Sequence, residues 1–217
     1  MDPAYWIKRW QEGQTGFHQT EVDRALKTYG DRLGEPGRVL VPLCGKSNDL
    51  TWLSKAGHSV IGIEVASEAV HAYFEGRGMT AMRSTDAGFD RWDGGGVAIW
   101  QADFFALTPE ILGPVTAAYD RAALVAMPPA KQEQYAKHLV SLVGARHPIL
   151  LVGIEYDQAE SAGPPFVITQ ADVTRLFGAT CDVEVLDRRD VLDESPRHKA
   201  RGITALHEST FLLRPRA

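Results

Sequence analysis

The sequence predicts an α/β protein with a mainly parallel sheet that ends in an antiparallel pair of strands. Three observations lead to this prediction. Short apolar runs alternate with stretches of helical periodicity between about residues 38 and 177. The runs are continuously apolar, which is typical of strands buried on both faces of a parallel sheet. After residue 180 the alternation stops, and two strand-like runs follow each other with no helical pattern between them.

The first expected element is a helix over residues 3–11, where Trp6, Ile7 and Trp10 fall on one face. A second helix is expected over about 20–29. Helices should cover both faces of the sheet that follows, which has seven strands. The further elements, in order, are strand 39–43, helix 47–56, strand 59–64, helix 67–77, strands 96–103 and 115–120, helix 130–142, strand 148–154, helix 169–177, and strands 181–188 and 204–215.

The segment between the last two strands, residues 189–203, is too polar and too rich in turn-forming residues for a buried helix. The two strands should therefore pair as an antiparallel hairpin at one edge of the sheet. This arrangement departs from the all-parallel, Rossmann-type dinucleotide-binding sheet. It matches the sheet of class I S-adenosylmethionine-dependent methyltransferases.

Length and charge indicate one acidic domain. The 217 residues correspond to about 1.4 domains of average size, and no linker or repeat divides them. We therefore expect a single domain over 1–217, with residues 1–35 as a helical arm that forms a lid over the active site. The 23 Lys and Arg against 28 Asp and Glu give a net charge of −5, which argues against nucleic acid as a partner.

Cysteine and hydropathy patterns indicate a cytoplasmic protein. Cys44 and Cys181 show neither a disulfide framework nor metal-ligand spacing, and the seven histidines form no HExxH motif, so no metal is expected. No apolar run reaches the 18 or so residues that span a bilayer, and the charged N-terminus does not resemble a signal peptide. We expect no membrane partner and a monomer.

The strongest candidate site is the turn PLCGKSND after the first strand, with Glu64 lying 19 positions beyond Gly45. Adjacent parallel strands bring both to one crevice, where a carboxylate can accept hydrogen bonds from the two hydroxyls of a cofactor ribose. The turn lacks the GxGxxG glycines that let a backbone approach a pyrophosphate. S-adenosylmethionine, which has no phosphate, is therefore favoured over NAD. Alternatively, Gly45 only closes a tight turn and Glu64 is a solvated strand end.

Asp103 ends the third expected strand, where such a fold commonly holds the adenine amino group, and Phe104 would stack on the adenine ring. Acidic strand ends are common, so a purely structural role for Asp103 stays open. Cys44 lies in the same turn as Gly45, but a small apolar residue that ends a buried strand is the favoured interpretation.

Five stretches of the chain resemble the thiopurine S-methyltransferase family, and in particular its bacterial members. The stretches are WIKRWQEGQTGFHQ, VLVPLCGKSNDLTWLSKAGHSVIGIE, YDRAALVAM, GPPFVI and RHKARGI. They occur in this order from residue 6 to residue 203, so the resemblance covers most of the chain and is more specific than any single motif.

The resemblance implies a cofactor site at the matching positions. Trp10 and Phe17 would close over S-adenosyl-L-methionine, Leu43 would contact it from the first strand, and Glu64 would hold its ribose. Trp6 belongs to the same arm, but aromatic residues at helical spacing usually pack in a core, and this alternative also applies to Trp10.

The resemblance also implies catalytic and substrate-binding residues. Arg121 would lie beside the methyl-transfer centre and contact the cofactor, and Arg197 would lie at the substrate mouth. Pro165 and Phe166 would belong to a loop that covers the substrate, and Phe17 would also contact it. Judged from the residues alone, Arg121 is an ion-pair partner of Asp120 or Glu155, and the basic run around Arg197 is a solvated loop.

The resemblance implies an S-methyltransferase that transfers a methyl group to aromatic or heterocyclic thiols such as thiopurines. In mammalian relatives the N-terminal arm is longer and an aromatic residue stands where this chain has Arg201, so a more polar acceptor pocket is expected here. Bacterial members suggest selenium and tellurium compounds as further acceptors, with tellurite resistance as an outcome. The alternatives are a thiol or halide methyltransferase, a non-catalytic S-adenosylmethionine-binding sensor and, least favoured, an NAD oxidoreductase.

Overall fold

The computed structural model describes residues 2–216, and the chain divides into two compact units. Unit 1 is Met1–Tyr119 and unit 2 is Asp120–Ala217. The boundary falls inside strand β6 (Ala117–Arg121). No helix within residues 2–216 combines the length and the apolar character needed to cross a bilayer.

Unit 1 contains a mixed sheet with the strand order β3-β4-β5-β2-β1-β6. The pairs β5–β2, β2–β1 and β1–β6 are parallel, which confirms the predicted parallel core of the sheet. The elements are α1 (Pro3–Gln11), α2 (Arg24–Tyr29), the 3-10 helix η1 (Gly30–Leu33), β1 (Arg38–Val41), α3 (Asn48–Lys55), β2 (Ser59–Glu64), α4 (Ser67–Glu75), β3 (Met82–Asp86), β4 (Phe89–Gly94), β5 (Val97–Gln101), η2 (Phe104–Ala106), α5 (Pro109–Leu112) and β6.

The apolar strands form the core of unit 1. Val39 and Leu40 of β1 and Val60 and Ile63 of β2 are completely buried, as continuous apolar runs predict. In the parallel pair β1–β2, Arg38 lies opposite Ser59, and in the parallel pair β2–β5, Glu64 lies opposite Gln101. The segments that follow β1, β2 and β5 therefore leave the sheet at the same edge.

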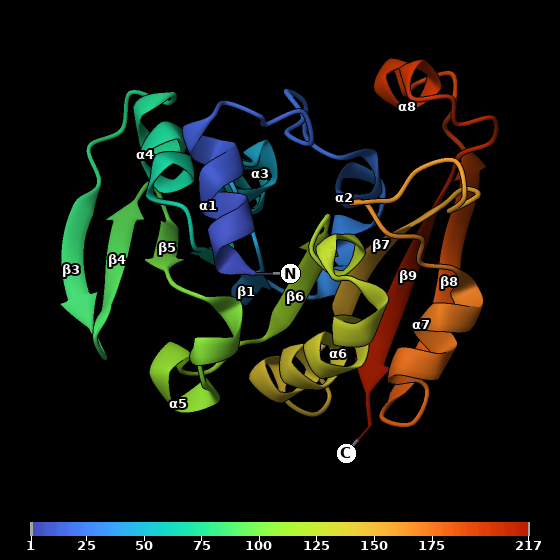
Figure 1. Cartoon of the computed structure of the whole chain (residues 1–217). Coiled ribbons are helices and arrows are strands. Elements are labelled where there is room, and N and C mark those ends of the chain that lie inside the picture. Colours follow the sequence, from blue (N-terminus) through green and yellow to red (C-terminus); the bar gives the residue numbers. More distant parts are fainter. Residues whose placement is uncertain (1, 217) are drawn as a thin grey trace. The chain divides into compact units, whose positions relative to one another are not determined.

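An antiparallel hairpin, β3–β4, is the main difference from the predicted sheet, so the described residues hold nine strands rather than seven. The hairpin extends the sheet beside β5 (Figure 1). Its strands are exposed or half-buried and carry no apolar run, which is the signal that marked the other strands. Its turn is Ala87-Gly88, both with positive φ, as in the type I′ turns of two-residue hairpins.

Helix α2 begins at Arg24 rather than near residue 20. The side chain of Asp23 accepts a hydrogen bond from the Ala25 N–H at 2.8 Å and so caps the helix. The Asp23 N–H in turn donates to Asp49 of α3 at 2.8 Å. This hydrogen bond joins residues 26 positions apart and fixes Asp23 as the cap of the helix. A contact of this kind cannot be inferred from the helical periodicity of the sequence.

Unit 2 ends in the predicted antiparallel strands. β9 pairs antiparallel with both β7 and β8, and a bulge lies between Val185 and Asp187. The polar segment between β8 and β9 holds a short helix, α8, that has no buried residue. The elements are η3 (Leu124–Ala126), α6 (Pro129–Val143), β7 (Ile149–Glu155), α7 (Gln170–Phe177), β8 (Cys181–Asp190), α8 (Pro196–Ala200) and β9 (His207–Pro215).

Candidate active site

The turn after β1 has an unusual backbone. Leu43 has φ +47° and Gly45 has φ +52°, and a non-glycine residue with positive φ is uncommon. A Cβ on Gly45 would lie 3.2 Å from Cζ2 of Trp10 in the arm. Glycine therefore serves two purposes here, because it adopts the left-handed conformation and lets the Trp10 ring approach the backbone.

Glu64, the last residue of β2, is tied to this turn. Its Oε2 accepts a hydrogen bond from the Gly45 N–H at 2.9 Å, and its Oε1 accepts one from the Ala66 N–H at 2.8 Å. Only 6% of the residue is exposed, which contradicts the alternative of a solvated strand end. Burial raises the pKa of Glu64, and the backbone hydrogen bonds partly oppose that rise.

The carboxylate of Glu64 has capacity left for a ligand. Each carboxylate oxygen can accept about two hydrogen bonds, and each accepts one from the backbone here. The Val65 N–H also contributes a backbone hydrogen bond to this carboxylate, and the acceptor capacity left on the two oxygens can serve hydroxyls of a ribose. The acceptor oxygens at this turn therefore suit the hydroxyls of a nucleoside.

Aromatic residues of the arm lie against the same turn. Trp10 is 8% exposed and packs with Ile7 on Ala66 and Ala69, just after β2. The Lys46 Nζ lies 5.9 Å from the centre of the Trp10 ring. The structure thus brings Trp10, Gly45 and Glu64 together, as predicted for one site.

Phe17 extends this aromatic group toward solvent. It is 36% exposed and meets the rings of Trp6 and Trp10 edge-on, at centroid distances of 5.3 and 5.7 Å. The Arg9 guanidinium lies 5.9 Å from the Phe17 ring centre. Trp6 packs against Phe17 and Tyr5, which agrees with a packing role.

Asp103 and Phe104 follow β5 at the same edge of the sheet. Asp103 caps the short helix η2 by accepting a hydrogen bond from the Phe105 N–H at 3.0 Å. Phe104 is 4% exposed and packs edge-on against Phe105. Both therefore have structural contacts, and their roles toward adenine stay predictions.

Arg77, which sequence reasoning missed, donates hydrogen bonds to the turn that follows β1. Its guanidinium lies 4.0 Å from the centre of the Tyr73 ring. Its Nη2 donates to the carbonyl oxygens of Lys46 and Ser47, at 3.4 and 3.3 Å, and to the side chain of Asn48. In the sequence Arg77 resembles an ordinary surface charge just after a helix, because its partners lie about 30 positions earlier.

Cys44 belongs to the turn and is 6% exposed. A Cβ on Gly62 of β2 would lie 2.6 Å from the Cys44 Sγ, so the sulfur fills the space that Gly62 leaves open. Burial, and then the charge of Glu64, raise the pKa of the thiol well above its ordinary value. A protonated, packed thiol agrees with the interpretation of Cys44 as a small apolar residue.

In unit 2, Arg121 is the last residue of β6 and is half-buried. The preceding Asp120 is fully buried and binds the Tyr135 hydroxyl and the Leu124 N–H, at 2.7 and 3.1 Å. Glu155, the other carboxylate considered as an ion-pair partner for Arg121, accepts hydrogen bonds from Ser209 at 2.8 Å and from Arg188.

The loop with Pro165 and Phe166 lies next to the segment that follows Arg121. The Phe166 N–H donates to the Val125 carbonyl oxygen at 2.6 Å. The Tyr156 hydroxyl donates to the Pro165 carbonyl oxygen at 2.5 Å, and the peptide bonds before Pro164 and Pro165 are cis. Two of the segments predicted to hold substrate therefore lie side by side within unit 2.

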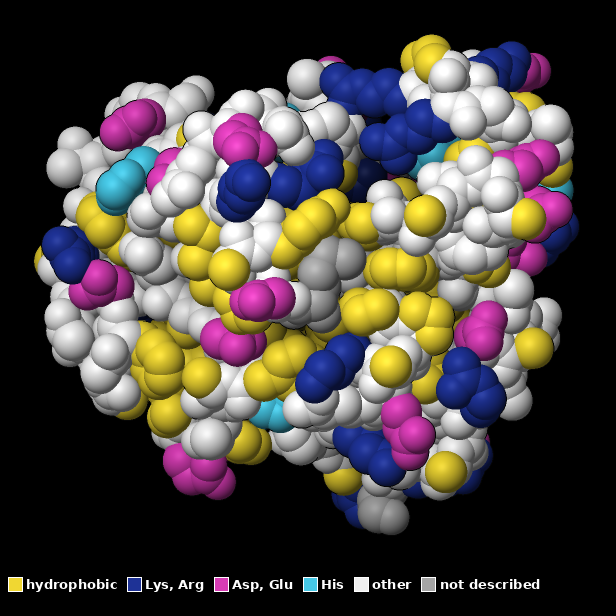
Figure 2. Space-filling view, viewed as in Figure 1, with side chains coloured by type: hydrophobic (Ala, Val, Ile, Leu, Met, Phe, Trp, Pro, Cys, Tyr) yellow, Lys and Arg dark blue, Asp and Glu magenta, His cyan; other side chains and the backbone are white. Residues whose placement is uncertain are grey.

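Arg197 lies in α8 and is exposed. Lys and Arg side chains gather around this helix (Figure 2). The loop that carries α8 is anchored by an apolar cluster of Tyr156, Val191, Ile203 and Leu206. Since Tyr156 also holds Pro165, the loop of Pro165 and the loop of Arg197 are connected through one buried side chain.

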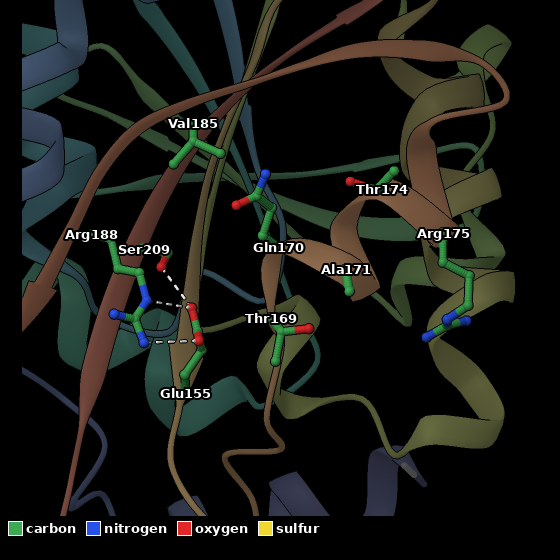
Figure 3. Close-up of a pocket in the computed structure, with 9 residues that line it drawn as sticks. All are labelled: Glu155, Thr169, Gln170, Ala171, Thr174, Arg175, Val185, Arg188 and Ser209. Carbon is green, nitrogen blue, oxygen red and sulfur yellow. Dashed lines mark hydrogen bonds and ion pairs between the residues drawn. The ribbon is translucent and has the colours of Figure 1, made fainter.

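A separate open groove of about 670 Å³ lies in unit 2, and none of the predicted site residues lines it (Figure 3). Arg188 reaches across part of it to Glu155, with a shortest distance of 3.3 Å. Within residues 2–216, no group of three or more His, Cys, Asp or Glu side chains is arranged to hold a metal ion. The groove is lined by Glu155, Thr169, Gln170, Ala171, Thr174, Arg175, Val185, Arg188 and Ser209.

Comparison with known proteins gives full-length matches. The model of the family "Thiopurine S-methyltransferase (TPMT)" matches residues 1–216. A thiopurine S-methyltransferase of Methylococcus capsulatus is 44% identical over 220 residues, which cover 100% of this chain and 99% of the relative. Another, of Nitrosospira multiformis, is 43% identical over 218 residues with the same coverage.

Solved structures agree on the fold. A 1,6-didemethyltoxoflavin-N1-methyltransferase of Burkholderia thailandensis, with bound S-adenosylhomocysteine, has a TM-score of 0.66 and 18% identity, and covers 99% of this chain and 87% of its own. A methyltransferase of Anabaena variabilis that depends on S-adenosylmethionine has a TM-score of 0.64 and 15% identity, with coverages of 99% and 95%. The class I methyltransferase fold predicted from the element order is thereby confirmed.

Proposed function

This chain belongs to the thiopurine S-methyltransferase family and is an enzyme that uses S-adenosyl-L-methionine; from that premise we propose that it methylates the sulfur of acidic aromatic or heterocyclic thiols. The observation that carries the proposal is the buried Glu64, bound to the Gly45 turn beneath Trp10. The carboxylate there can accept hydrogen bonds from a ribose, and the turn lacks the GxGxxG glycines that cradle a pyrophosphate.

We propose that Glu64 accepts hydrogen bonds from the cofactor ribose and that Trp10 and Phe17 cover the cofactor. Leu43 and Gly45 supply the backbone against which it lies, and Asp103 with Phe104 contact its adenine. The sulfonium of S-adenosyl-L-methionine supplies a strongly electrophilic methyl group. The chain's own contribution is alignment and exclusion of water, and holding two reactants in attack geometry can supply roughly 7 to 11 kcal/mol.

The acceptor would react as a thiolate, and we assign its stabilisation to Arg121 and Arg197. An arginine within about 4 to 6 Å lowers the pKa of an acid by roughly 1 to 3 units. This shift suffices for an aromatic thiol that is already acidic, so the thiol proton can leave to water without a dedicated base. The sulfur electron pair then forms the bond to the methyl carbon while the bond from that carbon to the sulfonium breaks. Pro165 and Phe166 cover the acceptor.

The exposed Arg201 next to α8 supports a polar acceptor pocket. We therefore include selenium and tellurium compounds among the proposed acceptors, with tellurite resistance as the biological consequence, because their soft, polarizable atoms react as thiolates do. The proposal places the enzyme in the cytoplasm as a monomer. Its two free cysteines, Cys44 and Cys181, are both buried thiols, as expected in a reducing compartment.

The proposal is tested by incubating the protein with radiolabelled S-adenosyl-L-methionine and a panel of aromatic thiols and selenium and tellurium compounds. We expect labelled thioether, and we expect Arg121→Ala and Arg197→Ala to lower the turnover of acidic thiols while sparing cofactor binding. Arg175→Ala is the matched control, because Arg175 is an exposed arginine paired with Asp172 at 3.0 Å in the same unit. Cofactor binding without any labelled product would favour the sensor alternative.

A further inference from the structure

A buried pair of polar side chains lies directly before Arg121. Asp120 and Tyr135 are both 0% exposed, and the Tyr135 hydroxyl donates to the Asp120 Oδ2 at 2.7 Å. Tyr135 lies in α6, whose neighbouring Gln132 is also buried and donates to the Met127 carbonyl oxygen at 3.2 Å. The start of α6 is thereby attached to the segment that follows β6.

The second oxygen of Asp120 closes a turn around Arg121. Its Oδ1 accepts the Leu124 N–H at 3.1 Å, across Arg121, Ala122 and Ala123. Ala122 has φ +67°, a left-handed conformation that a residue with a Cβ adopts only where surrounding contacts enforce it. The hydrogen bond from Leu124 is such a contact, so Asp120 helps to hold the backbone that presents Arg121.

Packing alone does not explain a carboxylate at this position. Taking a charge out of water is unfavourable unless it is compensated, and burial raises the pKa of Asp120 to about 6 despite its hydrogen bonds. An apolar residue would fill the space between β6 and α6 without that penalty. The carboxylate provides two acceptors that point in different directions, one toward α6 and one toward the turn.

From these contacts we propose that Asp120 and Tyr135 are positioning residues, which anchor the turn of residues 121–124 to α6 and so hold Arg121 in the orientation that stabilises the acceptor thiolate. This inference rests on the proposed function, in which Arg121 binds the acceptor. The same anchor extends to the acceptor loop, because the Phe166 N–H donates to the carbonyl oxygen of Val125, the residue after Leu124.

The test compares variants that remove one hydroxyl from a buried bond to a carboxylate. Tyr135→Phe removes the donor to Asp120. Ser209→Ala is the matched control, since Ser209 is 1% exposed and donates at 2.8 Å to Glu155, a carboxylate outside the turn of residues 121–124. We expect Tyr135→Phe to lower kcat/KM for an aromatic thiol about tenfold. The Kd of S-adenosyl-L-homocysteine should change less than twofold, and Ser209→Ala should leave both constants within twofold.

Two further measurements separate positioning from general destabilisation. In an Arg121→Ala background, Tyr135→Phe should have less than a twofold additional effect, because a positioning residue acts only through the side chain it positions. Asp120→Asn keeps an acceptor for the Leu124 N–H and a donor toward Tyr135, so it should retain more activity than Asp120→Ala. Hydrogen exchange at the Leu124 amide should speed up in Asp120→Ala.

The outcomes distinguish this inference from the proposed function. If the unchanged protein forms no thioether, the proposed function fails, and the inference fails with it. If the unchanged protein is active and Tyr135→Phe is equally active, only the positioning role is overturned. An undiminished effect of Tyr135→Phe in the Arg121→Ala background would likewise show that the pair does not act through Arg121.

Discussion

Replacing Glu64 by glutamine tests the cofactor site most directly. Glu64→Gln keeps the shape of the side chain, removes its charge and exchanges one oxygen for an NH₂ group. In the structure the two oxygens accept the N–H groups of Gly45 and Ala66, at 2.9 and 2.8 Å. One of these N–H groups will face a donor instead of an acceptor, and under the proposed assignment one ribose hydroxyl will lose its carboxylate partner.

The expected loss follows from these contacts. A hydrogen bond to a charged group contributes about 1.5–3 kcal/mol, and the remaining bond becomes a weaker neutral one. A combined loss of about 3 kcal/mol corresponds to about a hundredfold increase in the Kd of the cofactor. Stability should respond less, because a buried N–H without a partner costs about 1–3 kcal/mol while removal of the buried charge offsets part of that cost.

Calorimetry with S-adenosyl-L-homocysteine measures the Kd, and thermal denaturation of the same samples confirms that they are folded. Glu75→Gln is the matched control, since Glu75 is the exposed last residue of α4 and the same chemical change there should leave the Kd within twofold. A Kd for Glu64→Gln within threefold of the unchanged protein, with the fold intact, would refute the assignment of Glu64 to the ribose.

Three further predictions concern the elements around this site. Burial raises the pKa of Asp120 from an ordinary 3.8 to about 6, so the protonated carboxyl stabilises the fold below about pH 4. This contribution is lost as the pH rises through about 6. Urea unfolding between pH 4 and 7 should therefore show the free energy of unfolding fall by about 2–3 kcal/mol relative to Asp120→Asn. Arg77→Lys loses the planar fork that binds the turn, and we expect the cofactor Kd to rise about fivefold, whereas Arg83→Lys on the exposed β3 should leave it unchanged. Gly62→Ala places a Cβ 2.6 Å from the Cys44 Sγ and should destabilise the fold by about 1–3 kcal/mol, most of which Cys44→Ala should restore.

Each of these predictions has an outcome that contradicts it. A difference between Asp120 and its Asn variant that is constant from pH 4 to 7 would mean that the carboxylate does not titrate in this range. Equal cofactor affinity in Arg77→Lys would mean that the turn holds its shape without the guanidinium. Additive effects of Gly62→Ala and Cys44→Ala would mean that the two positions do not share one space.

Local sequence patterns determined most of the elements. Strand 59–64 was predicted from its apolar run and lies at Ser59–Glu64, and the antiparallel ending was predicted from two adjacent strand-like runs. The nearness of Gly45 and Glu64 also followed from sequence, because neighbouring parallel strands end at one edge. The family was recognisable from five ordered stretches of residues, and the full-length match confirms it.

Only the tertiary structure decided which side chains support the site. Arg77 donates to carbonyl oxygens 30 and 31 positions earlier in the sequence, and Tyr135 donates to a carboxylate 15 positions earlier. These sequence separations do not correspond to the repeat of a helix or a strand. The β3–β4 hairpin has no buried face and so left no apolar pattern. Periodicity reports the burial of a residue's own element, whereas a hydrogen-bond partner brought close by folding leaves no trace in the local sequence.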